Sequence, residues 1–131
     1  MIVLDTSALF ALLNRKDPDH ERVKSVLLAD PGPYLVAAGA LAEIAYLTEE
    51  RLGLGALEAL LTDLETGALS LDCGDGDLPR IRQLVARYAD LPLGFADAAV
   101  LALAERSGGR VLSLDHHFHV VAREGKVQVL P

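Results

Sequence analysis

The sequence of 131 residues contains one cysteine and no tryptophan, and its tyrosine and phenylalanine residues make up only 5% of the chain. The single cysteine, Cys73, excludes an intrachain disulfide, so this is no disulfide scaffold, and a reducing compartment such as the cytoplasm is expected. Because aromatic side chains are few, the sequence gives little sign of a surface on which nucleic-acid bases could stack.

Long apolar segments are also missing. The apolar runs are interrupted by charged residues or glycine well before the roughly 20 residues that a membrane-spanning helix needs. The first five residues, Met1 to Asp5, have neither the basic start nor the apolar stretch of a signal peptide. We therefore expect a cytoplasmic protein without a membrane segment.

Positive charge is scarce. Twelve lysine and arginine residues stand against nineteen aspartate and glutamate residues, which gives a net charge of −7. Phosphate contacts dominate nucleic-acid affinity, so an acidic chain taken alone argues against nucleic-acid binding. That argument weakens if several carboxylates share one site and hold divalent cations, because a bound metal reverses the local charge. The net charge therefore leaves the question open.

The sequence does have enough apolar residues, 51%, to bury a core, and its length suits a single domain over residues 1–131. Short apolar runs alternate with helical patterns. Strands are expected at 2–4, 34–37, 69–73, 110–114 and 127–130, helices at 7–13, 17–28, 40–51, 54–65, 78–88 and 95–106, and a short segment at 117–122. This alternation predicts an α/β fold with a mostly parallel sheet covered by helices on both faces.

Four acidic residues occupy unusual places in this pattern. Asp5 and Asp115 each end an expected strand, so their carboxylates should emerge at the same edge of a parallel sheet. Glu43 and Asp97 lie within apolar helical sequence, near the starts of their helices, which face the same edge. We therefore expect the four carboxylates to converge on one place.

Crowded carboxylates repel one another, and a cluster of four is tolerable mainly when a cation holds it together. Oxygen ligands suit Mg²⁺ or Mn²⁺, and such a site favours metal-assisted phosphodiester hydrolysis. Taken one at a time, these acids also have structural explanations. Asp5 and Asp115 could cap the turns after their strands, Asp97 could stabilise a helix N-terminus, and Glu43 could be a solvated helix residue. Taken together, four such coincidences are less plausible than one site.

The same acids lie in blocks that resemble a known family. These are Leu4-Asp5-Thr6-Ser7, the segment from Leu41 to Leu47 around Glu43, Asp97-Ala98-Ala99, and Leu112 to Asp115 followed by Phe118. Their order and spacing are similar to those of PIN domains, and most of all to the VapC-type toxins of toxin–antitoxin pairs. The resemblance runs through nearly the whole chain.

The resemblance implies a three-layer α/β/α sandwich around a sheet of about five strands. It implies a Mg²⁺- or Mn²⁺-dependent endoribonuclease that cuts RNA such as transfer or ribosomal RNA. It also implies a homodimer and a VapB-like antitoxin that covers the site. Asp5, Asp97 and Asp115 would be metal ligands, and Glu43 would bind the metal directly or through water. Thr6 and Ser113 would support these carboxylates by hydrogen bonding.

Several residues beside these blocks have more than one interpretation. Ser7 is expected to be the N-cap of the first helix, although it could also support the site. His116, His117 and His119 could chelate a transition metal, but no cysteine or second histidine cluster completes such a site, which favours solvated side chains or contacts with RNA phosphates. The arginines Arg80, Arg82 and Arg87 on one helix, and Arg15 and Lys16 after the first, could bind phosphate or form a solvated face. Residues 37–40 predict a weakly capped helix start before Glu43.

Three other functions share parts of this acidic pattern. A haloacid-dehalogenase-like phosphatase needs a second aspartate two residues after the first, and that position is Ser7. A receiver domain needs a lysine at the end of a later strand, and none is so placed. A non-catalytic PIN-like interaction module remains the main alternative, although a site without catalysis has no reason to keep mutually repelling carboxylates.

Overall fold

The computed structural model describes all residues 1–131. Its strands are β1 (Ile2–Leu4), β2 (Tyr34–Ala37), β3 (Ser70–Asp72), β4 (Arg110–Leu112) and β5 (Gln128–Leu130). Its helices are α1 (Thr6–Leu13), α2 (His20–Ala29), α3 (Ala38–Leu52), α4 (Leu54–Thr66), α5 (Leu78–Arg87), α6 (Phe95–Arg106) and α7 (His116–Ala122), with a 3₁₀ turn at Asp75–Asp77. None of the helices is both long and apolar enough to span a membrane.

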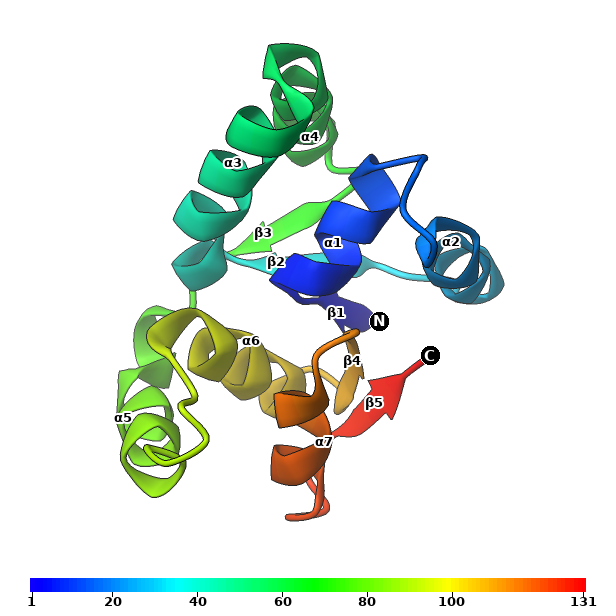
Figure 1. Ribbon diagram of the computed structural model, residues 1–131. Helices are drawn as coiled ribbons and strands as arrows, with labels where there is room; N and C mark the ends of the chain where they lie inside the picture. The colour runs from blue at the N-terminus through cyan, green and yellow to red at the C-terminus, as the bar shows by residue number, and fades with distance from the viewer.

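The five strands form one parallel sheet in the order β3-β2-β1-β4-β5. The chain moves outward from β1 to β3, then returns across the sheet to β4 and β5. Because parallel crossovers are right-handed, this reversal places α1 to α4 on one face and α5 to α7 on the other. Figure 1 shows the two groups of helices on opposite sides of the strands. The predicted α/β fold, a parallel five-stranded sheet between two helical layers, is confirmed.

The core explains why one helix has almost no polar face. Every residue of β1 is fully buried, and α6 buries seven consecutive residues, Ala98 to Ala104. This helix packs against β1, β2 and β4 at the centre of the sheet. A helix surrounded by protein is apolar all round rather than on one stripe. Asp97 lies in the first turn of α6, just before this buried stretch, and is therefore an acidic residue at the start of an otherwise apolar segment.

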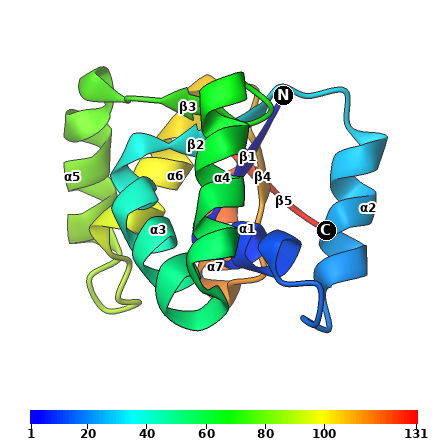
Figure 2. The same ribbon diagram turned by 90° about the horizontal axis from the view of Figure 1, so that it is seen from above.

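Close contact between α3 and α6 brings the two helices that bear Glu43 and Asp97 together. Figure 2 shows α6 beside and partly behind α3, in agreement with this contact. The approach depends on Gly39: a Cβ atom there would lie 2.8 Å from the Cβ of Ala99 and 3.0 Å from Cε1 of Phe95. A glycine is thus needed where the helices cross.

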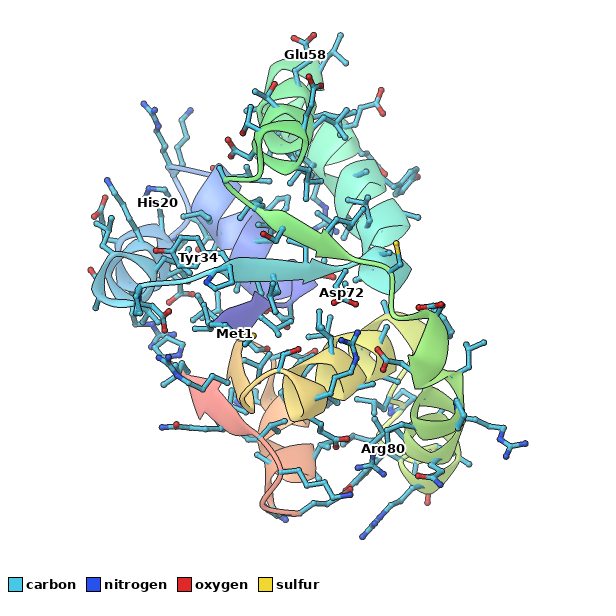
Figure 3. All side chains as sticks on the ribbon, turned by 180° about the vertical axis from the view of Figure 1, so that it is seen from behind. Met1, His20, Tyr34, Glu58, Asp72 and Arg80 are labelled. Carbon is cyan, nitrogen blue, oxygen red and sulfur yellow. The ribbon has the colours of Figure 1, made fainter.

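Ion pairs fix α6 at its C-terminal half. The guanidinium of Arg80 on α5 donates to Glu105 on α6, at 2.7 and 2.8 Å, and to Glu124 after α7, at 2.9 Å. Arg106 at the end of α6 binds Asp72, the last residue of β3, and Asp77 in the 3₁₀ turn that follows. Figure 3 shows Arg80 on α5 and Asp72 at the end of β3. Arg80 is therefore not the free phosphate-binding side chain that the sequence allowed.

Several predicted element boundaries were wrong. Helix α2 begins at His20 rather than residue 17, because the Asp17 carboxylate accepts a hydrogen bond from the Asp19 amide at 2.8 Å and stabilises a turn that includes Pro18. Helix α3 begins at Ala38, so Glu43 lies in its second turn and not near its start. Ala37 offers no side-chain cap to α3, as predicted. Strands β3 and β4 each end earlier than expected.

Candidate functional site

The candidate site lies where the direction of the chain through the sheet reverses. Strands β1 and β4 are neighbours, but the segments that follow them leave toward opposite faces, and ligands bind at such points in parallel sheets. A pocket of about 420 Å³ opens there. All four predicted acids line it, and so does a fifth, Asp17; the other lining residues are Thr6, Ser7, Phe10, Leu47, Arg51 and Leu114. The structure thus brings Asp5, Glu43, Asp97 and Asp115 together.

Asp5 is the most buried of the four acids, with 3% of its surface exposed. Its Oδ1 caps α1 by accepting a hydrogen bond from the Ala8 amide at 2.8 Å, and it also accepts one from the Ser7 hydroxyl at 2.7 Å. Its Oδ2 accepts a hydrogen bond from the Ser113 hydroxyl at 2.6 Å. Burial raises the pKa of Asp5 despite these hydrogen bonds. The carboxylate is held rigidly at the base of the pocket.

Two serines connect Asp5 to the segment that bears Asp115. The Ser113 hydroxyl accepts a hydrogen bond from the Asp115 amide at 3.0 Å, and the Ser7 hydroxyl accepts one from the Leu114 amide at 2.9 Å. The expected hydrogen bond from Ser113 to a site carboxylate is present. Thr6 makes no side-chain hydrogen bond to any acid, so the support expected of it comes from Ser7 instead. Ser7 is also not the N-cap of α1, because Asp5 is.

Asp97 is the acid whose charge is least compensated. Burial and then the neighbouring carboxylates of Asp115, Asp5 and Glu43 raise the pKa of Asp97 to about 6, and only His117 acts in the opposite direction. No protein group donates a hydrogen bond to its carboxylate. A half-buried carboxylate crowded by three others is costly in the absence of a cation.

Asp115 combines a structural role with a place in the site. Its Oδ1 caps α7 by accepting a hydrogen bond from the His117 amide at 2.9 Å. The Nδ1 atom of the His117 ring lies 3.6 Å from the same oxygen. One ligand atom from each of Asp97, Asp115 and His117 lies within 4.8 Å of the other two, close enough for one ion to bind all three. Asp5 and Asp115 therefore cap the helices that follow their strands, as the structural explanation predicted, and they line the acidic pocket at the same time.

His117 is the residue that sequence reasoning undervalued. The sequence pattern does not separate the three histidines, but all three lie on α7, and only His117 faces the acids. His116 and His119 are exposed and stand apart, so the histidine trio is not a chelating motif. The available signal was Asp115 as a candidate N-cap, because the cap hydrogen bond from the His117 amide holds His117 beside that carboxylate.

The donor set fits a hard divalent cation. Asp97 and Asp115 offer carboxylate oxygens, and the buried Asp5 and the exposed Glu43 line the same pocket. Such oxygens suit Mg²⁺ or Mn²⁺, and one imidazole nitrogen in the set is more usual for Mn²⁺ than for Mg²⁺. The pocket is therefore a candidate metal centre.

Replacing Ser7 with alanine is expected to weaken Mn²⁺ binding by about 10- to 100-fold, because groups that orient site carboxylates contribute on that scale. The change removes the hydrogen bond to Asp5 and leaves the Leu114 amide unpaired. Isothermal titration calorimetry with Mn²⁺ measures the effect. Thr6→Val is the matched control, and it should bind like the wild type. Equal losses in both variants would contradict the assigned role of Ser7.

Comparisons with known proteins agree with this geometry. The PIN domain family profile matches residues 2–124. The protein named Ribonuclease VapC26, from Mycobacterium tuberculosis (strain ATCC 25618 / H37Rv), is 33% identical over 135 residues, an alignment that covers 99% of this chain and all of that protein. The crystal structure of Mycobacterium tuberculosis VapC20, described as a sarcin-ricin loop cleaving toxin, superimposes with a TM-score of 0.85 at 24% identity, with both chains fully covered. The similarity to VapC20 shows that the two proteins share a fold.

Proposed function

Because this chain belongs to the PIN-domain family, among its VapC-type ribonucleases, we propose that its acidic pocket is a divalent-metal site for hydrolysis of RNA phosphodiester bonds. The protein is an endoribonuclease of the toxin–antitoxin type. The observation that carries the assignment of the site is Asp97. Its carboxylate is half-buried, receives no hydrogen bond and faces three other acids, which is unfavourable unless a cation binds there.

Each acid has a separate part in the proposed site. Asp97, Asp115 and His117 would hold the cation, and Glu43, which lines the same pocket, would bind it directly or through water. Asp5, immobilised by two serines, would fix the position of the negative charge at the base. When bound, the cation would neutralise charge that develops on the phosphoryl group and make a bound water more acidic. We assign Mg²⁺ or Mn²⁺ to this role.

The proposed biological setting follows from the VapC-type relationship. The substrate class is RNA, with transfer or ribosomal RNA as candidates, and the partner is a VapB-like antitoxin that silences the site. We further propose a homodimer in the cytoplasm, with residues 1–131 as a single PIN domain. A non-catalytic PIN-like module is disfavoured because such a protein gains nothing from the charge repulsion around Asp97.

The test is cleavage of total RNA by purified protein that is free of any partner. We expect discrete products with Mg²⁺, no products with EDTA, and none from Asp5→Ala or Asp115→Asn. The Glu43→Gln variant should be strongly impaired. Its matched control is Glu58→Gln, because Glu58 points outward from α4, far from the strand ends (Figure 3), and that variant should stay active.

Two results would contradict the proposal. One is a wild-type protein that cuts no RNA and, by calorimetry, binds neither Mg²⁺ nor Mn²⁺; a binding module would then be the better account. The other is cleavage that survives both EDTA and the loss of Asp5, which would place the chemistry elsewhere.

A further inference from the structure

The acidic pocket contains a single cationic side chain, Arg51. It comes from the last turn of α3 and lines the pocket together with five carboxylates. RNA approaching this pocket presents phosphates to a region of negative charge on a protein whose net charge is −7. Even with the metal site filled, a strand needs positive charge beside it to be held in place. Arg51 is the only residue lining the pocket that supplies it.

Arg51 is held in place without using its hydrogen-bond donors. Its Cζ atom lies 5.7 Å from the centroid of the Phe10 ring, on α1. It forms no ion pair, and its side chain donates no hydrogen bond. A guanidinium over an aromatic face keeps its N–H groups available at its edge, where they match the oxygens of a phosphate. By contrast, the guanidinium groups of Arg80 and Arg106 donate hydrogen bonds to carboxylates of the protein.

The position of Arg51 shows which phosphate it can reach. It follows Glu43 by eight residues on α3, a rise of about 12 Å along the helix axis. That separation places the base of the Arg51 side chain toward the end of the pocket away from Glu43. A side chain at this end of the pocket meets the backbone of a strand whose cleaved bond lies among the acids.

We propose that Arg51 binds a backbone phosphate of the RNA next to the cleavage position, and that Phe10 positions its guanidinium. The inference rests on the proposed function, since it assigns a substrate contact to the same pocket. Arg51 is a binding residue here, and Phe10 acts through it. A helix-stabilising arginine near the α3 C-terminus would account for the charge but not for its place in the pocket.

The experiment measures RNA binding as a function of salt. A fluorescently labelled pool of total transfer RNA serves as the probe, in Ca²⁺, with anisotropy recorded over a series of KCl concentrations. The probe need not be the true substrate, because phosphate contacts are independent of sequence. Arg51→Ala is expected to weaken binding about tenfold and to reduce the slope of log affinity against log salt by about 0.7 to 0.9, the loss of one phosphate contact.

Three further variants separate this contact from general charge and folding effects. Arg51→Lys should keep the salt slope while losing part of the affinity, because it retains the charge without the planar fork. Phe10→Leu should weaken binding less than Arg51→Ala. Arg82→Ala removes an exposed, unpaired arginine on α5 outside the acidic pocket, and it should leave both quantities unchanged.

The outcomes distinguish this inference from the proposed function. Wild-type protein that binds RNA but cuts none with Mg²⁺ contradicts the nuclease assignment, while the slope of Arg51→Ala still reports on the contact. An unchanged slope in Arg51→Ala, an equal drop in Arg82→Ala, or no RNA binding by the wild type overturns the contact. So does a defect of Arg51→Ala confined to binding a protein partner.

Discussion

Replacing Asp97 with asparagine is expected to stabilise the metal-free protein and to lower RNA cleavage by about 100- to 1000-fold. The loss of activity follows from removing a charged oxygen ligand from the site, where a single electrostatic contact contributes on that scale. The gain in stability follows from removing one of four mutually repelling carboxylates. Because Asp97 is partly exposed and solvent screens the repulsion, we expect only on the order of 1 to 2 kcal/mol at pH 8.

The stability effect of Asp97 depends on pH with a definite sign. Burial, then Asp115, Asp5 and Glu43, raise its pKa in the folded protein to about 6, from an ordinary value of 3.8. The folded state therefore holds this proton more tightly than the unfolded chain. The resulting stability is fully present below about pH 4 and is lost as the pH rises through about 6. The advantage of Asp97→Asn should consequently be near zero at pH 4 and complete at pH 8.

Urea unfolding in EDTA at these two pH values measures the difference, and cleavage of total RNA with Mg²⁺ measures the activity. Asp90→Asn, an exposed acid outside the pocket, is the matched control and should change neither. If Asp97→Asn is less stable than the wild type at pH 8 in EDTA, the carboxylate has a favourable partner and the crowding argument is wrong. If the variant cuts RNA normally, Asp97 is not a metal ligand.

Adding a methyl group to Gly39 is expected to lower the free energy of unfolding by about 1 to 3 kcal/mol, as overpacking usually does. The new Cβ of Gly39→Ala would lie 2.8 Å from the Cβ of Ala99, which cannot rotate away because it is fixed to the α6 backbone. The Phe95 ring is half exposed and can move aside, so Ala99 dominates the cost. The helices α3 and α6 must separate, and Glu43 and Asp97 would separate with them. Activity should therefore fall as well.

The matched control for Gly39→Ala is Gly55→Ala, which should change the free energy of unfolding in the opposite direction. A Cβ at Gly55, in the first turn of α4, would meet nothing within 4 Å. Gly55→Ala should thus raise the free energy of unfolding by up to about 1 kcal/mol, through helix propensity and reduced freedom of the unfolded chain. Urea unfolding of both variants gives the comparison. If Gly39→Ala gains stability as Gly55→Ala does, α3 and α6 are not in close contact at Gly39 and the overpacking argument is wrong.

Local pattern was enough to predict the class of fold and the edge of the sheet on which the acids gather. The alternation of strand and helix periods depends on neighbouring residues, and a parallel sheet presents all its strand ends on one side. Asp5 directly follows β1, and Asp115 caps the helix after β4, so their convergence could be foreseen. The helix starts predicted at residues 17 and 40 were wrong. They also depend on neighbouring residues, but the turn after Asp17 and the uncapped start at Ala38 are only weakly marked in the sequence.

Contacts between distant residues decided the rest. Ser113 donates to Asp5 across 108 positions of sequence, and nothing local separates the roles of Thr6 and Ser7. The selection of His117 over its neighbours depends on how α7 is rotated about its axis, and the contact of Arg51 with Phe10 depends on how α1 and α3 pack. A sequence period shows which residues share a face of one helix. Only the packing of helices against the sheet determines which faces meet.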